Sequence, residues 1–453
     1  EGSPSDIAAS HYNVASMYSI LDRKNEALEY FLNALRLWQQ VPEMVPSKLA
    51  TSYDDVAESL IKLNRDEEAL PYYQNALEIR QEESNIDRLG IANSHNNLAG
   101  TFYRLDRFEE ALAEYNNSLG IRQADPNGAP LELAKSYDNV ANLYFQMDLF
   151  EDALPHYQES LTILEALTVV SSDDLATAHE NLGRVYQRTY GINQAMPHYE
   201  SAVKIRKESS DPNLARLAVT LTELAQTYRY QGRYGEALAI FQEALDQVEN
   251  LHRADSPEIA TALNNIADIL ISIGDFEEAS SLLEQALEIL EKAPETEPLD
   301  LDTARNSMAA LMVRMGKDGQ SLKLFESVLE ILEQDENTDP LDLARVKNNL
   351  AVTYSSADKN EKALALYEEV QAIRDGILPE GHHELAQTLY NQAAVLNRMK
   401  DYQKAIDLAE QSLEIWTQAL GYNHPTTGKA LNLLGMLYEA DGNYPQALEL
   451  FSD

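Results

Sequence analysis

Residues Asn96 to Arg122 read NNLAGTFYRLDRFEEALAEYNNSLGIR, and this stretch decides the fold. Its apolar residues recur at spacings of three and four, which is typical of two amphipathic helices. A short connection, Leu105-Asp106-Arg107, separates the two helices. Because so short a turn leaves no room for a crossover, the stretch predicts an antiparallel helical hairpin.

The same stretch is copied along the whole chain. Its second helix opens with Glu-Ala-Leu, and we number each copy from the alanine of this motif as position zero. Position zero is occupied by Ala27, Ala69, Ala111, Ala153, Ala195, Ala237, Ala279, Ser321, Ala363, Ala405 and Ala447. Eleven copies thus follow one another every 42 residues without an insertion. A fixed period of this length indicates a solenoid, which grows by stacking and needs no single central core.

Each copy also places residues of one size at fixed positions. Position −12 is small throughout: Ala15, Ala57, Ala99, Ala141, Gly183, Ala225, Ala267, Ala309, Ala351, Ala393 and Gly435. Position +4 is mostly aromatic: Phe31, Tyr73, Tyr115, Tyr157, Tyr199, Phe241, Phe325, Tyr367 and Phe451. A small residue lets two helices approach closely, and a large one fills the space beside it. These positions therefore predict the packing seam of each repeat.

This pattern resembles the tetratricopeptide repeat. The 42-residue period and the phrases HNNLA at 95–99 and LGYNHP at 420–425 look like the kinesin-light-chain and nephrocystin-3 subfamily. The tryptophan usual in the first helix of such repeats is missing, since position −16 holds histidine or tyrosine in the first five copies. The resemblance implies an all-α fold, an α-solenoid in which helix-turn-helix repeats wind as a right-handed superhelix.

We therefore expect residues 1–453 to form one solenoid of eleven repeats. The expected repeats span approximately 4–45, 46–87, 88–129, 130–171, 172–213, 214–255, 256–297, 298–339, 340–381, 382–423 and 424–453, the last being truncated. Two copies depart from the pattern. Repeat eight carries Ser321 at position zero, and repeat five has Tyr190-Gly191-Ile192 in its turn. Neutral drift in a redundant array is the favoured explanation of both departures, and the alternative is a looser helix pair that acts as a hinge.

Composition limits the partners and the chemistry. Lys plus Arg number 35 and Asp plus Glu number 75, which gives a net charge of −40. Such a surface repels phosphate backbones and anionic lipids, so we expect no nucleic-acid partner and no membrane insertion. It would steer a basic partner, although solubility alone also explains it. The absence of cysteine excludes disulfides and thiolate chemistry.

No apolar run approaches the roughly 18 residues of a membrane span, and no signal peptide is visible. A cytoplasmic protein is expected, with an exported protein that has lost its signal as the alternative. The sequence contains no metalloprotease, nucleophile-elbow, phosphate-loop or dinucleotide motif. We therefore expect no enzyme activity, no cofactor and no metal site.

Asparagine is the residue that sequence reasoning places on the inner surface. By the resemblance, first helices line the concave face, and position −14 points inward. That position holds Asn97, Asn139, Asn181, Asn265, Asn349 and Asn391. An amide both donates and accepts, so a ladder of amides can pair with the backbone of an extended peptide. The alternative is that these amides tune contacts between adjacent helices or meet water.

Cations recur at position −7 of the same helices, as Arg104, Arg188, Arg314 and Arg398. On an inner face they could receive acidic side chains of a peptide. The alternative is that cations near the end of a helix complement its dipole. Some relatives grip a terminal carboxylate with Lys, Arg and Asn on three helices. Here position −15 has no Lys or Arg, so that clamp is not expected.

The sequence thus predicts a non-catalytic protein-protein interaction scaffold that holds an extended peptide or a partner helix in its concave groove. One alternative is the sensor segment of a larger signalling protein. Another is a structural subunit that self-associates end to end through its C-terminal end, because the last copy stops at Asp453, six residues after Ala447.

Overall fold

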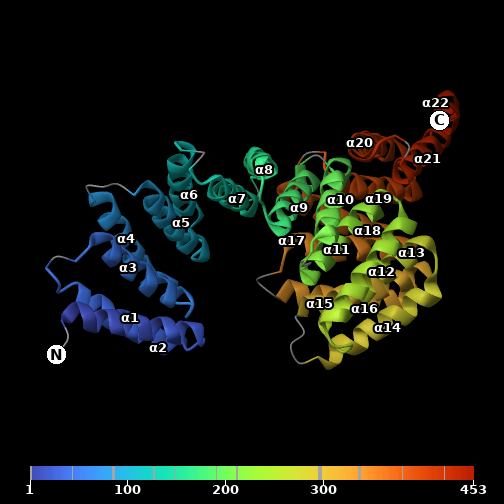
Figure 1. Ribbon diagram of the computed structural model, residues 1–453. Helices are drawn as coiled ribbons and strands as arrows, with labels where there is room; N and C mark the ends of the chain where they lie inside the picture. Colours follow the sequence, from blue (N-terminus) through green and yellow to red (C-terminus); the bar gives the residue numbers. More distant parts are fainter. Residues whose placement is uncertain are drawn as a thin grey trace. The chain divides into compact units, whose positions relative to one another are not determined.

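The computed structural model describes residues 3–42, 44–83, 87–125, 128–147, 149–189, 191–210, 213–293, 298–334, 338–379, 381–422 and 424–452. In these ranges every regular element is an α-helix (Figure 1). Two helices occupy each 42-residue repeat, and each first helix ends a few residues before position zero. The expected all-α fold of helix-turn-helix repeats is confirmed.

The first four repeats contain α1 (Pro4–Ile20), α2 (Lys24–Trp38), α3 (Pro46–Ile61), α4 (Asp66–Glu82), α5 (Arg88–Arg104), α6 (Phe108–Gln123), α7 (Pro130–Gln146) and α8 (Phe150–Ala166). The next four contain α9 (Ser172–Thr189), α10 (Ile192–Glu208), α11 (Leu214–Tyr230), α12 (Tyr234–Leu251), α13 (Pro257–Ile273), α14 (Phe276–Lys292), α15 (Pro298–Arg314) and α16 (Asp318–Gln334). The last three contain α17 (Pro340–Ser356), α18 (Asn360–Ile377), α19 (His383–Met399), α20 (Tyr402–Leu420), α21 (Pro425–Ala440) and α22 (Tyr444–Ser452).

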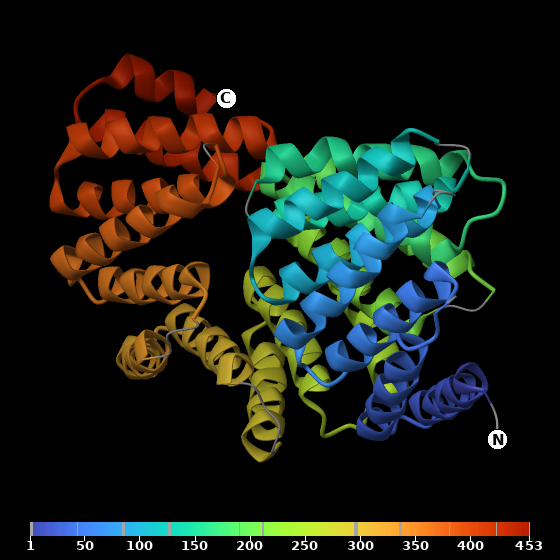
Figure 2. The same ribbon diagram turned by 90° about the vertical axis from the view of Figure 1, so that its left-hand side faces the viewer.

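The helices form two compact units. Unit 1 comprises Glu1–Val170 with α1 to α8, and unit 2 comprises Ser171–Asp453 with α9 to α22. Within each unit, the two helices of a repeat pack side by side, and the second packs on the first helix of the next repeat (Figure 2). One solenoid over all 453 residues stays a prediction.

Small residues form the seam inside each repeat. Ala111 at position zero and Ala99 at position −12 are both fully buried. In repeat five, a Cβ placed on Gly183 at position −12 would lie 2.9 Å from the ring of Tyr199, the fully buried aromatic residue at position +4. The small position therefore allows the aromatic side chain to pack against the backbone of the first helix.

A left-handed residue at position −5 ends most first helices. Its φ lies between 54° and 65° at Asp22, Asn64, Asp106, Asp358 and Lys400, and between 71° and 91° at Gly232, Gly274, Gly316 and Gly442. The backbone N–H of such a residue returns to the helix it ends; that of Gly274 donates to the carbonyls of Leu270 and Ile271. The left-handed residue at position −5 thus reverses the chain between the two helices of a repeat.

Repeat eight accommodates its serine without an unsatisfied hydroxyl. Ser321 is fully buried, and its Oγ donates to the carbonyl oxygen of Ala309 at 2.9 Å. This bond links the start of the second helix to the first helix of the same repeat. At position zero of repeat eight, a hydrogen bond therefore replaces the apolar contact that alanine makes in the other copies.

Buried or partly buried arginines at position +11 join successive repeats, a contact that sequence reasoning missed. Each donates to a serine or threonine at position −17 of the next repeat. The pairs are Arg80 with Ser94, Arg122 with Ser136, Arg206 with Thr220 and Arg374 with Thr388. Arg122, Arg206 and Arg374 are at most 5% exposed. A buried guanidinium needs several acceptors, so these residues fix how one repeat sits on the next.

The last described helix, α22, presents large apolar side chains to solvent. Tyr444 is 67% exposed, Leu448 69% and Phe451 47%. Docking of this face on a second copy would bury them. Self-association through the C-terminal end stays a prediction, and a molecular mass from light scattering that does not rise with concentration would contradict it.

Candidate binding surface

The asparagines at position −14 bridge neighbouring first helices in three repeats. The side-chain Nδ2 of each donates to an asparagine Oδ1 at position −15 of the preceding repeat. The pairs are Asn139 with Asn96 at 2.7 Å, Asn349 with Asn306 at 3.2 Å and Asn391 with Asn348 at 3.0 Å. Each of these asparagines is partly buried. Each side-chain amide uses one N–H donor to bind the neighbouring helix and has a second N–H donor.

The other three predicted asparagines have different surroundings. Asn265 accepts from Gln226 Nε2 at 3.4 Å, Asn181 is 8% exposed, and Asn97 is partly buried. Several of the asparagines at position −14 therefore form hydrogen bonds with an adjacent helix. Peptide binding by these asparagines stays a prediction.

The arginines at position −7 divide into two kinds. Arg104 donates through Nε to Asp66 at 2.5 Å, and Arg398 donates to the backbone carbonyl of Ser355 at 2.5 Å, so both bind the preceding repeat. Arg314 is exposed, and no carboxylate lies within ion-pair distance of it among the residues that the structure describes.

Two repeats place an acid, where most have asparagine, at position −14. Burial raises the pKa of Asp55 to about 6, with the neighbouring carboxylates of Asp54 and Glu58 adding to the rise. Burial also raises the pKa of Glu223, and the nearby guanidinium groups of Arg184 and Arg188 partly offset this rise. Arg188 therefore has a carboxyl group as a neighbour within its own fold.

A small chamber in unit 2 brings two of the predicted residues together. Its volume is about 240 Å³. It is lined by Tyr234, Ile271, Ser272, Ala310, Val313, Arg314, Phe325, Asn349, Val352 and Lys429. Most of these residues belong to the first helices α13, α15 and α17, while Lys429 comes from α21. Arg314 and Asn349 were expected from the sequence, and Lys429 was not.

The chamber is positively charged on an apolar base. Arg314 and Lys429 are both exposed, and the described residues that line the chamber include no Asp or Glu. Ile271, Val313 and Val352 supply apolar surface. In a chain of net charge −40, two cations with no acidic side chain among the described residues around them form a site suited to an anionic group.

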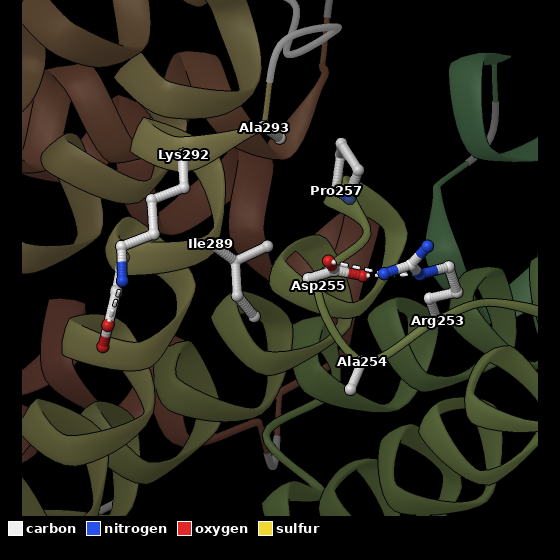
Figure 3. Close-up of a pocket in the computed structure, with 8 residues that line it drawn as sticks. Arg253, Ala254, Asp255, Pro257, Ile289, Lys292 and Ala293 are labelled. Atoms are coloured by element: carbon white, nitrogen blue, oxygen red, sulfur yellow. Dashed lines mark hydrogen bonds and ion pairs between the residues drawn. The ribbon is translucent and has the colours of Figure 1, made fainter.

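A second hollow lies at the end of α14 and the loop before α13 (Figure 3). Its volume is about 870 Å³, but its charges are paired locally. Arg253 Nε lies 3.1 Å from Asp255, and Lys292 Nζ lies 2.5 Å from Glu288. None of the predicted binding residues lines this hollow, so it does not bear on the predicted groove.

No three His, Cys, Asp or Glu side chains within the described ranges are grouped so that they could hold a metal ion. No helix in the part of the chain that the structure describes has the length and apolarity needed to cross a bilayer.

Comparison with family models identifies the class of protein. Tetratricopeptide-repeat models match residues 7–41, 48–124, 132–208, 216–292, 300–375 and 384–453. The chain therefore belongs to the tetratricopeptide-repeat family, as the sequence predicted. A search of curated proteins returned no match.

Solved structures are similar to this chain at low sequence identity. The apo form of the quorum sensor NprR from B. thuringiensis matches 79% of this chain and 99% of its own, with 14% identity and a TM-score of 0.57. A Rap protein complexed with competence and sporulation factor matches 82% of this chain and 99% of its own, with 13% identity and a TM-score of 0.51. A putative kinesin light chain of Podospora anserina matches 46% of this chain and 97% of its own, with 21% identity and a TM-score of 0.36.

Proposed function

We propose that the protein is a non-catalytic scaffold that binds an extended, acidic peptide across the first helices of unit 2. The chamber carries this proposal, because Arg314 and Lys429 line one space in which none of the described lining residues is acidic. A carboxylate of the peptide would accept hydrogen bonds from both cations, and charge-assisted bonds of this kind are among the stronger ones in proteins.

The rest of the chamber supplies groups for a peptide backbone. Asn349 donates to Asn306 and accepts from Asn348 Nδ2 at 3.3 Å. An amide has two N–H donors and two lone pairs, so Asn349 keeps one of each for a ligand. Tyr234 and Ser272 add two hydroxyl groups at the same place. Extended peptides bind in this way through main-chain hydrogen bonds, with specificity from side-chain pockets.

A binding measurement tests the proposal. The probe is a fluorescein-labelled pool of ten-residue peptides with two fixed glutamates, compared with a pool in which lysine replaces both. We expect the acidic pool to raise fluorescence anisotropy, and the variant Arg314→Gln with Lys429→Gln to weaken that binding about tenfold or more, since each lost charge-assisted bond is worth roughly 1.5–3 kcal/mol.

The matched control is Arg253→Gln, which removes a cation from the second hollow and should leave the affinity unchanged. Equal binding of the acidic pool to the double variant, or equal binding of the acidic and lysine pools, would contradict the proposal.

A regulatory or sensing role is the second candidate. It is favoured by the shared fold with a quorum sensor and with a Rap protein complexed with competence and sporulation factor. A sensor must change conformation when its ligand binds. Small-angle scattering with a saturating acidic peptide tests this candidate, and an unchanged radius of gyration would leave the scaffold role alone.

A further inference from the structure

In unit 2, residues around α10 and α11 contact residues around α19 to α21. About half of the chain separates some of these contacting residues in the sequence. Helices α10 and α20 lie side by side (Figure 1). Asn193 Nδ2, at the start of α10, donates to the backbone carbonyl of Ala419, near the end of α20, at 3.3 Å. Gln231 Nε2, after α11, donates to Asn193 Oδ1 at 2.9 Å. Gly191 has a φ of +85°, and a Cβ there would lie 3.4 Å from the carbonyl oxygen of Ala419. The unusual turn of repeat five thus packs directly on repeat ten; Tyr190 lies outside the described residues.

Histidines supply the other half of this contact. The ring of His383 meets the ring of Tyr230 edge-on, with 5.1 Å between centroids, and lies 4.4 Å from the ring of His382. The imidazole of His424 faces the backbone of Tyr230 and Gln231. The imidazoles of His383 and His424 therefore meet the C-terminal end of α11, and the ring of His382 packs on that of His383.

Two of these histidines cap helices with an unprotonated nitrogen. His382 Nδ1 accepts from the backbone N–H of Glu384 at 3.3 Å, at the start of α19. His424 Nδ1 accepts from the backbone N–H of Thr426 at 3.0 Å, at the start of α21. Protonation would remove the acceptor and place a positive charge at a helix N-terminus, where the dipole opposes it.

The third histidine has no polar partner. Neither Nδ1 nor Nε2 of His383 has a hydrogen-bond partner among the residues that the structure describes. A neutral imidazole tolerates such a site better than an imidazolium ion, whose two N–H donors and charge would both be unsolvated.

The surrounding charges are mostly positive. Arg188 of α9 and Arg374 of α18 face His382, Arg229 of α11 and Arg374 face His383, and Lys429 of α21 faces His424. Glu384 is the one carboxylate among the groups that act on His382, and it also lies 3.2 Å from Arg374. These cations add to the cost of protonating any of the three imidazoles.

Burial and these neighbouring cations lower the pKa of His382 to about 3 and that of His383 to about 4. Burial also lowers the pKa of His424, although the backbone of Tyr230 and Gln231 partly offsets the effect. Released from the contact, each histidine would return toward its ordinary pKa of about 6.5.

We propose that this contact is a pH-sensitive latch, which holds the α10–α11 end of unit 2 against α19–α21 while its histidines are neutral and opens when they are protonated. The latch comprises Gly191, Asn193, Tyr230, Gln231, His382, His383, Ala419 and His424. The proposal concerns the shape of unit 2 and does not depend on which ligand it binds.

The lowered pKa values of the histidines imply that the latch opens at low pH. A histidine with a depressed pKa in the closed state stabilises that state fully above about pH 6.5, and the stabilisation is lost as the pH falls from 6.5 toward 4. Each unit of depression corresponds to a tenfold change in the closed-to-open ratio. His383 alone would then reduce that ratio on the order of 100-fold by pH 4.

A distance measurement tests the latch. Because the chain has no cysteine, Gln194→Cys on α10 and Gln418→Cys on α20 introduce two unique exposed sites for spin labels. We expect a short inter-label distance at pH 7.5 and a longer one at pH 4.5, with a midpoint between 4 and 6.5 set by the latch histidines.

The decisive comparison uses a variant that lacks the three titrating histidines of the latch. His382→Asn with His424→Asn keeps both helix caps, since asparagine is a good N-cap residue, and His383→Phe keeps an aromatic ring. In this triple variant the short distance should persist at pH 4.5. His252→Asn, which removes an exposed histidine elsewhere in unit 2, should leave the transition unchanged.

Far-UV circular dichroism on the same samples separates opening from unfolding. An unchanged distance between pH 7.5 and 4.5, the same lengthening in the triple variant, or a lengthening that follows loss of helicity would each overturn the latch.

Discussion

Replacing Arg206 by methionine should lower the free energy of unfolding of unit 2 by about 3–5 kcal/mol, because it breaks a buried ion pair and leaves its acid behind. Arg206 is 2% exposed. Its Nη1 lies 2.6 Å from Asp173 and its Nη2 lies 2.6 Å from Glu180, while its Nε donates to Thr220 at 3.0 Å. One side chain thus joins α9 and α11 to the end of α10.

Methionine keeps much of the volume but none of the donors. Glu180, whose side chain is 12% exposed, would lose the guanidinium of Arg206 and keep its hydrogen bond with the Thr220 hydroxyl. Urea denaturation followed by circular dichroism measures the effect. The control Arg253→Met removes an arginine that is 87% exposed and pairs with Asp255, and it should leave the midpoint unchanged. A similar midpoint for both variants would contradict a structural role for the buried arginines.

Introducing a side chain at Gly183 should cost about 2–3 kcal/mol, the second large effect. A Cβ at this position would lie 2.9 Å from two atoms of the Tyr199 ring. That ring is fully buried, so it has no space into which to move. The clash should outweigh the roughly 1 kcal/mol that replacing a helical glycine normally adds to helix stability.

Gly183→Val is the variant to measure, by thermal denaturation of the whole chain. Gly428→Ala is its control, since Gly428 lies in α21 and a Cβ added there would have no neighbouring atom within 4 Å, so the substitution should not destabilise unit 2. If Gly183→Val lowers the thermal stability no more than Gly428→Ala does, the small residue at position −12 does not set the distance between the two helices of a repeat.

The helix pairs were predictable because their cause is local. The residues at positions zero, −12 and +4 alternate in size with a helical period, and each pair is closed by a turn of few residues. The left-handed turn column is equally local: aspartate, asparagine or glycine stands at position −5 in most copies, and these residues reach positive φ most readily. Such features need no knowledge of distant parts of the chain.

The arginine bridges were missed because a charged residue on an amphipathic helix reads as solvent-exposed. A signal was present in the sequence. Where position +11 is arginine, position −17 of the next copy is serine or threonine; where it is leucine, as at Leu164, Leu290 and Leu332, that position is Ala178, Ala304 or Val346. The polar and apolar choices change together, as two residues in contact do.

The candidate site was only partly predictable. Arg314 and Asn349 could be selected because they share inward positions of successive copies. Lys429 could not, because it reaches the chamber only through the curvature of unit 2, which the repeat pattern does not specify. The latch has the same origin, since it joins Asn193 and Ala419, which lie 226 positions apart.

Hydrogen exchange with mass spectrometry, with and without the acidic peptide pool, tests the proposed function most directly. Binding in the chamber predicts slower exchange in α13, α15, α17 and the start of α21, and no such protection in the Arg314→Gln, Lys429→Gln variant. Protection confined to unit 1 or to the hollow around Arg253, or protection that survives in the double variant, would contradict it.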